Sequence, residues 1–215
     1  MMRIAEKFLT EAERKQVEGR IAKAEERTSG EIVVMIAPTS HHYHDATLLG
    51  SSLFAVLTGL LVSLLSGKEH FWFFLAVFAV SFVILNELFR RVLPLKRLFV
   101  NRADMKEEVE EAAIRSFYRS GINRTAKHTG ILVYISLFEH KVRVIADQGI
   151  NAKVAEGTWQ ELVDTITQGF QNRQHAAALS AAIDRCGDIL APHFPRRDDD
   201  INELSNTIII GGVSD

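Results

Sequence analysis

The stretch Ile131-Leu-Val-Tyr-Ile-Ser-Leu-Phe-Glu-His-Lys-Val-Arg-Val-Ile-Ala146 decides the fold class, because it holds the strongest β-strand pattern of the chain. Residues 131–137 are nearly all apolar, which predicts a buried strand. Residues 138–140 form a turn, and residues 141–146 then alternate in polarity, which predicts a second strand with one wetter face. We expect Asp147-Gln148-Gly149 to end this hairpin.

A third strand and four helices are predicted around the hairpin. Residues 31–37 are apolar and β-branched and are followed by Pro38, which is typical of a buried strand. A capping-box pattern opens a helix that runs to about Arg27. The pattern consists of Thr10 and Glu13, and the predicted buried stripe of the helix is Ala12, Val17, Ile21 and Ala24.

The remaining helices follow from apolar spacing. Asp104 can cap a helix that ends near Gly121, where a left-handed residue is favoured. Two further helices have apolar residues three and four apart, over residues 159–170 and 179–190. Cys186 lies in the second stripe, so we expect a buried core residue; as the single cysteine, it excludes an internal disulfide and a thiolate metal cluster.

Two uncharged apolar runs interrupt this α/β pattern, at residues 46–66 and 71–86. About 20 apolar residues suffice to cross a bilayer, and only residues 67–70 join the runs. They predict a transmembrane helical hairpin over residues 46–93, apolar on too many sides to be buried in so small a domain. Small residues permit close approach of its helices; they are Gly50, Ser51, Ser52, Thr58, Gly59 and Ser63.

The positive charges predict the orientation of the hairpin. Its second run is followed by Arg90, Arg91, Lys96, Arg97 and Arg102, whereas the short loop has only Lys68. Positive residues are retained in the cytoplasm, so we expect a two-span protein of the inner (cytoplasmic) membrane with its soluble domain on the cytoplasmic side. We expect no cleavable signal peptide, because residues 1–45 have no apolar signal core.

The element order predicts one discontinuous domain, residues 1–45 and 95–215, interrupted by the hairpin of residues 46–93. A small mixed sheet with helices on both faces fits this order best, so the fold class is α/β, an αβα sandwich. The net charge of −2 gives no reason to expect nucleic-acid binding, which usually needs a basic face.

Several of these motifs resemble the TPM domain family. They are Thr28-Ser29-Gly30-Glu31 before the first strand, Gly130-Ile-Leu-Val-Tyr-Ile-Ser, and Lys141-Val-Arg-Val. Asp147-Gln148-Gly149-Ile150 stands where the family usually has a glycine-tyrosine-glycine turn. The resemblance covers most of residues 10–191 outside the hairpin, and it suggests a bacterial-type member with an inserted transmembrane hairpin.

This resemblance implies an αβα sandwich. It also implies three associations of the family: acid phosphatase activity in a plant member, binding of divalent cations such as Ca²⁺ or Mg²⁺, and assembly or repair of membrane complexes. The chain departs from the family pattern in two respects. Gln148 replaces the usual tyrosine, and the hairpin lies inside the domain, whereas most relatives are exported or anchored by a terminal helix.

Three segments are candidate metal ligands, each with a plainer alternative that we favour. Asp147 ends a strand, where open α/β sheets tend to place ligands such as divalent cations, but it can equally bond its own backbone in a turn. His41-His42-Tyr43-His44-Asp45 could bind zinc or copper, or suit a lipid headgroup layer. Asp198-Asp199-Asp200 could attract calcium, but it lacks the spacing of a calcium hand and fits a solvated acidic run.

No catalytic constellation emerges from the sequence. It has no Gly-rich phosphate loop, no Asp-x-Asp pair at a strand end and no Cys-x5-Arg loop, so we assign no catalytic and no cofactor-binding residue. The sequence therefore favours a non-enzymatic, membrane-tethered interaction or assembly module, whose partners are the lipid bilayer and other membrane proteins or a second copy of itself. The alternative is a divalent-cation-dependent phosphatase of the TPM type.

Overall fold

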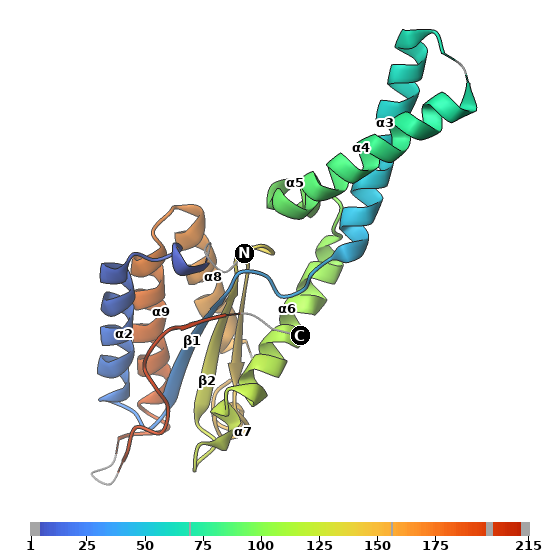
Figure 1. The fold of residues 1–215 in the computed structure, drawn as a ribbon. Coiled ribbons are helices and arrows are strands. Elements are labelled where there is room, and N and C mark those ends of the chain that lie inside the picture. The colour runs from blue at the N-terminus through green and yellow to red at the C-terminus, as the bar shows by residue number, and fades with distance from the viewer. Residues whose placement is uncertain (1–4, 69, 156, 197–199, 212–215) are drawn as a thin grey trace. The chain divides into compact units, whose positions relative to one another are not determined.

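The computed structural model describes residues 5–211 except residues 69, 156 and 197–199 (Figure 1). The chain divides into two compact units, one made of Met1–His41 with Lys106–Asp215 and the other of His42–Met105. The first unit contains the sheet, and the second contains two long apolar helices. The domain boundaries given by the sequence, 1–45 with 95–215 around 46–93, stay a prediction.

A mixed sheet of four strands in the order β3-β2-β1-β4 forms the centre of the first unit. β1 (Glu31–Ala37) runs parallel to β2 (Gly130–Ser136), with Glu31 opposite Gly130 and Ala37 opposite Ser136. β3 (Lys141–Ala146) is antiparallel to β2, and β4 (Ile209–Ile210) is parallel to β1. The predicted α/β class and mixed sheet are confirmed; β2 is one residue earlier than predicted.

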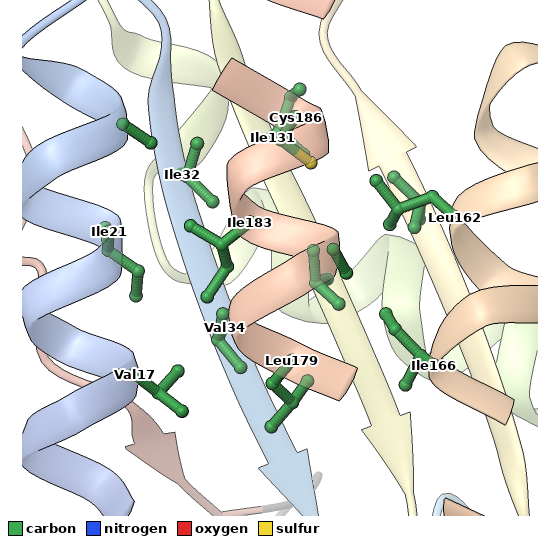
Figure 2. Close-up of a cluster of buried hydrophobic side chains, with 14 of the residues drawn as sticks. Val17, Ile21, Ile32, Val34, Ile131, Leu162, Ile166, Leu179, Ile183 and Cys186 are labelled. Carbon is green, nitrogen blue, oxygen red and sulfur yellow. The ribbon is translucent and has the colours of Figure 1, made fainter. Parts of the chain in front are cut away.

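Three helices cover one face of the sheet: α2 (Glu11–Glu25), α8 (Thr158–Gln171) and α9 (His175–Leu190). α2 and α9 lie side by side (Figure 1). Figure 2 shows the apolar side chains that fill this layer. They include Val17, Ile21, Ile32, Val34, Leu162, Leu179, Ile183 and Cys186. The buried position of Cys186 is confirmed, and burial raises the pKa of its thiol to about 12.

The opposite face of the sheet is covered by α6 (Arg102–Arg119) and the short 3-10 helix η1 (Ile122–Arg124). Val109, Ala113 and Phe117 of α6 pack on strand residues that point to this side. Those strand residues are Val33, Met35, Leu132 and Tyr134. Because alternate strand residues face opposite sides, both faces are apolar, and the sheet is buried between two helical layers as the sequence predicts.

Helix ends show where the sequence reasoning was right and where it was wrong. The capping box of α2 is present, because Thr10 Oγ1 accepts from the Glu13 N–H at 3.3 Å and Glu13 Oε2 accepts from the Thr10 N–H at 2.8 Å. Ala12 is exposed, since it precedes Ile21 by nine residues, half a turn away on a helix. α6 begins before Asp104, where Asn101 Oδ1 accepts from the Ala103 N–H.

The second unit contains α3 (His44–Ser66), α4 (Phe71–Arg91) and the short α5 (Leu93–Arg97). α3 and α4 pack against each other and are long and apolar enough to cross a membrane. In the most apolar part of α3, 22% of the residues are buried, and in the most apolar part of α4 none is buried. The exposed side chains are large and apolar, such as Leu49, Leu57, Leu60, Val80 and Val83.

Two glycines of α3 are packed against phenylalanines of α4. A Cβ atom at Gly50 would overlap the ring of Phe89, and one at Gly59 would lie 2.8 Å from Cε2 of Phe74. The small residues therefore permit close approach inside the hairpin, as expected. Because these two glycines are already covered by α4, they leave no groove for a further helix at those positions.

Candidate functional site

Asp147, the predicted metal ligand, is a buried residue at the end of β3. Its Oδ1 accepts from the Gln148 N–H at 2.7 Å and caps α7 (Gln148–Asn151), and its Oδ2 lies 3.2 Å from His128 Nδ1. β3 is antiparallel to β2, so this strand end lies at the amino ends of β1 and β2. It is therefore not at the carboxyl edge where α/β sheets usually bind ligands.

The turn that begins at Asp147 has a clear packing role. A Cβ atom at Gly149 would lie 2.6 Å from the carbonyl oxygens of Lys127 and His128, so only glycine lets that loop approach so closely. His128 itself has a left-handed backbone, with φ 54°. The backbone bond of Asp147 agrees with the turn interpretation, and a role for this carboxylate in metal binding stays a prediction.

Among the described residues, the histidine-rich segment is not part of any group of side chains that could hold a metal ion. His41 Nδ1 lies 3.1 Å from Glu108 Oε2, and the rings of His42 and His44 are 5.7 Å apart. Within the described part of the chain, no group of three or more His, Cys, Asp or Glu side chains could hold a metal ion. Asp198 and Asp199 lie outside the described residues.

The Thr28-Ser29-Gly30-Glu31 motif holds later segments of the chain against the amino end of β1. Thr28 Oγ1 and the Ser29 N–H both donate to the Phe194 carbonyl, at 2.7 and 2.9 Å. The Glu31 carboxylate accepts the N–H groups of Glu203 and Leu204, at 3.1 and 3.2 Å. The motif that carries the family resemblance is therefore a structural clamp in this chain.

Two carboxylates near this clamp have raised pKa values. Burial raises the pKa of Glu31, against the effect of its two backbone donors. Burial also raises the pKa of Glu25 to about 7, although Glu25 Oε1 accepts from the Ile32 N–H at 2.9 Å. Among the described residues, Glu25 Oε2 is buried without a hydrogen-bond partner, and the nearby Glu31 carboxylate adds a like charge, so both burial and repulsion disfavour ionisation of Glu25.

Sequence reasoning missed a buried polar cluster at the carboxyl ends of β1 and β2. Its centre is Glu139, which is 1% exposed and lies in the segment predicted as a simple turn. Glu139 Oε1 accepts from the Ser40 N–H at 3.0 Å and from Thr39 Oγ1 at 3.2 Å, and Oε2 accepts from the Ser136 hydroxyl. Ser40 Oγ in turn donates to Ser136 Oγ at 2.9 Å and lies 3.3 Å from the Tyr134 hydroxyl.

The sequence signal for this cluster was an acid in a turn that follows a strand ending in serine. A serine beside a carboxylate is the pairing that nucleophilic catalysis uses. Here Ser136 and Glu139 are each only 1% exposed, so no substrate reaches them in this conformation. Burial raises the pKa of Tyr134, which keeps the phenol protonated. The cluster therefore fixes the ends of two strands.

An open cleft of about 770 Å³ lies between α6 and β4 in the first unit. We call it the α6–β4 cleft. Its lining is apolar toward the sheet and carries two arginines, and it includes Met35, Ile114, Arg115, Tyr118, Arg119 and Ile209. Local sequence patterns do not predict this cleft, because its walls come from three segments far apart in the chain.

The sheet with its two helical layers defines the class of the protein, an αβα sandwich. The family model of the TPM domain, named TPM_phosphatase, matches residues 92–189. Residues 92–189 therefore match the TPM domain, the family that the motifs of the sequence resemble.

A solved structure supports the fold separately. The NMR structure of the BA42 protein from the psychrophilic bacterium Bizionia argentinensis superposes with a TM-score of 0.61 at 23% identity, over 95% of this chain and 96% of that chain. At this identity the likeness shows the fold alone. No curated protein matches the chain.

Proposed function

We propose that this protein is a membrane-anchored TPM-domain protein that acts as a non-enzymatic interaction or assembly module of a membrane complex. The observation that carries the anchoring is the pair α3 and α4, whose large apolar side chains face outward along both helices. At 1.5 Å per residue, helices of 23 and 21 residues are about 35 and 32 Å long. The hydrocarbon core of a bilayer is about 30 Å thick.

Two polar side chains of α3 support this environment, whereas Ser63 Oγ is buried without a partner among the described residues. Ser51 Oγ donates to the Leu48 carbonyl at 3.1 Å, and Thr58 Oγ1 donates to the Phe54 carbonyl at 2.8 Å. Polar side chains in lipid need such internal partners, because no water is present to bond them. Glu87 lies near the end of α4, and its Oε1 is 2.6 Å from Nη2 of Arg91. This ion pair can hold the charge of Glu87 at the interface between lipid and water.

The distribution of positive charge is the reason to place the TPM domain on the cytoplasmic side. Arg90 and Arg91 end α4, and α5 adds Lys96 and Arg97, whereas Lys68 is the one basic residue of the loop sequence. The excess of positive residues near the chain ends of the hairpin favours retention of that side in the cytoplasm.

Extraction of membranes tests the anchor directly. Membranes from cells that express the full chain are washed with alkaline carbonate, and the chain should stay in the pellet. A variant in which Leu57→Arg and Val80→Arg place charges on the exposed faces should leave the membrane, whereas Leu57→Ile with Val80→Ile should not. Release of the unaltered chain into the wash would contradict the anchor.

The assembly role is tested by purification from native membranes after mild crosslinking. A tagged full chain should retain a defined membrane-protein partner, or a second copy, in amounts near one to one. A chain that purifies alone and monomeric after crosslinking would contradict this role. Replacement of Gly50 and Gly59 would not test this role, because both contact α4 within the hairpin.

The phosphatase alternative is favoured by the name of the matching family model and by the Asp147–His128 pair. A buried carboxylate that orients a half-exposed histidine is a recurring feature of hydrolytic and metal sites. It predicts phosphate release from a model ester with Mg²⁺ or Ca²⁺ present, lost in Asp147→Ala and kept in the exposed control Asp164→Ala. Equal and negligible release from all three would remove this alternative.

A further inference from the structure

A run of basic residues lies where the chain leaves the apolar hairpin. Arg90 and Arg91 lie in the last turn of α4, Arg97 is the last residue of α5, and Arg102 is the first residue of α6. We call residues 90–102 the basic segment. Arg90, Arg91 and Arg102 are exposed, so most of the charge of this segment is carried at the surface.

The described acids of this unit balance only part of that charge. The carboxylate of Glu87 lies 3.9 Å from Arg90 Nη1 and 2.6 Å from Arg91 Nη2. Asp104 lies in the first turn of α6, and Asp45 lies in the first turn of α3. Even when all three acids are counted, the five basic residues of the segment outnumber them. The basic segment therefore has charge complementarity with an anionic ligand.

Aromatic and polar contacts fold the basic segment back against the hairpin. The centroid of the Phe99 ring lies 5.5 Å from that of Phe89 in α4 and 6.2 Å from that of Phe54 in α3. Lys96 is buried, and its ammonium group donates to the carbonyl of His42, which lies shortly before α3. These contacts hold α5 and the turn after it beside the two apolar helices (Figure 1).

The folded segment displays an apolar side chain beside its arginines. Leu98 lies between Arg97 and the packed Phe99, yet it is 78% exposed. An exposed leucine next to basic residues is typical of a segment that lies in the membrane interface, with its apolar side among the acyl chains. Arginine can lay its aliphatic stem along these chains while its guanidinium group reaches the headgroups.

We infer that the basic segment binds the phosphate groups of anionic phospholipids, with Leu98 among their acyl chains. Guanidinium groups bind phosphate oxygens in pairs, and basic residues next to a membrane-spanning helix attract anionic headgroups. The inference rests on the proposed membrane anchor and names the lipid that this anchor selects. It goes beyond the orientation of the hairpin, because orientation by positive charge requires no preference among lipids.

Quenching of a single tryptophan by brominated lipid tests the inference. The full chain carries Leu98→Trp, with Trp72→Phe and Trp159→Phe to remove the native signals, in bilayers that mix phosphatidylglycerol with phosphatidylcholine. Bromine is placed on the acyl chains of one lipid at a time. Phosphatidylglycerol should quench residue 98 beyond its share of the bilayer. The preference should be at least about fivefold, the factor that one basic residue near a membrane surface provides.

Charge variants show whether the basic segment causes the preference. Arg97→Gln with Arg102→Gln should lower it by about fivefold or more. The charge-matched control is Lys68→Gln with Arg173→Gln, which removes two positive charges outside the segment and should leave the preference unchanged. A chain that keeps only Trp72, at the loop end of α4, shows whether the hairpin is inserted. Its tryptophan should be quenched with a smaller preference than residue 98.

The outcomes separate this inference from the proposed anchor. Equal quenching of residue 98 by both lipids, or a preference that survives Arg97→Gln with Arg102→Gln, would overturn the inference. Loss of the preference on addition of inorganic phosphate at constant ionic strength would also overturn it, because the segment would then bind the free ion. If Trp72 is quenched and residue 98 is not, only this inference fails. If neither is quenched, the proposed anchor fails.

Discussion

α4 and α8 show how the same secondary structure is specified for two different surroundings. α8 buries Leu162 and Ile166 against the sheet and exposes polar residues on its other side. In α4 only Phe89 is buried, and many of its exposed side chains are large and apolar, such as Trp72, Val80, Val83 and Ile84. A helix packed on a sheet needs one apolar stripe, whereas a helix in lipid needs apolar residues all round. The difference predicts different responses to substitution.

The largest contrast is expected between a core residue of the sandwich and an exposed apolar residue of the hairpin. Ile183 in α9 is 1% exposed, so Ile183→Ala should lower the free energy of unfolding of the domain by about 2–5 kcal/mol. Leu57 in α3 is 52% exposed, so Leu57→Ala should change it by less than about 0.5 kcal/mol. Denaturant unfolding of both variants in micelles measures the contrast; equal losses would break the comparison.

A second contrast depends on pH. The pKa of Glu25 is about 7 in the folded domain against 4.5 for an ordinary glutamate, so the folded state binds this proton more tightly than the unfolded state. The stability from this group is complete below pH 4.5 and is lost as the pH rises through about 7. Glu25→Gln, which stays neutral, should be more stable than the unaltered chain at pH 8, by about 1–3 kcal/mol, and similar at pH 4.5.

Thermal unfolding at the two pH values measures the effect of Glu25. The neighbouring exposed Glu26 provides the control, and Glu26→Gln should unfold like the unaltered chain at both. If Glu25→Gln has the same advantage at pH 4.5 and pH 8, the raised pKa is not its cause.

A third contrast compares two helical glycines. Gly50→Ala should destabilise the contact between α3 and α4 by about 1–3 kcal/mol, because the ring of Phe89 occupies the place of the new methyl group. At Gly19 in α2, by contrast, no other part of the described chain lies within 4 Å of an added Cβ atom. Helix hydrogen exchange in micelles should therefore show faster exchange in α3 for Gly50→Ala. If Gly50→Ala exchanges its amide hydrogens no faster than the unaltered chain anywhere in the hairpin, the packing of Gly50 on Phe89 is contradicted.

The smallest effect is expected at Gly19 itself. Alanine has the higher helix propensity, so Gly19→Ala should raise the stability of the domain by about 0.5–1 kcal/mol. Denaturant unfolding measures this gain. A loss of stability would mean that the space beside Gly19 is filled in solution.

The sequence predicted the fold well where a regular pattern was long. The strands of residues 31–37 and 141–146 and the stripes of α8 and α9 were placed correctly, because each contains several apolar residues in one register. The exposure of Ala12 was missed, since a single small residue carries little pattern. β4 is two residues long and pairs with a strand far away in sequence, which local spacing cannot reveal.

The site was less predictable because it depends on pairing direction. Asp147 was correctly placed at a strand end, but only the antiparallel register of β3 shows that this end lies beside the amino ends of β1 and β2. Glu139 looked like a turn residue, but its carboxylate bonds the Ser40 N–H, 99 residues earlier in the chain. The α6–β4 cleft likewise requires the tertiary fold.

Labelling of single cysteines tests the central claim, that α3 and α4 cross the membrane with the TPM domain on the cytoplasmic side. Cys186 can remain, because it is buried and its thiol pKa is about 12. New cysteines are placed in the loop by Lys68→Cys and on the exposed side of α8 by Gln160→Cys. In spheroplasts, an impermeant maleimide should label Lys68→Cys at once and Gln160→Cys only after lysis. Labelling of both before lysis, or of Gln160→Cys alone, would contradict the claim.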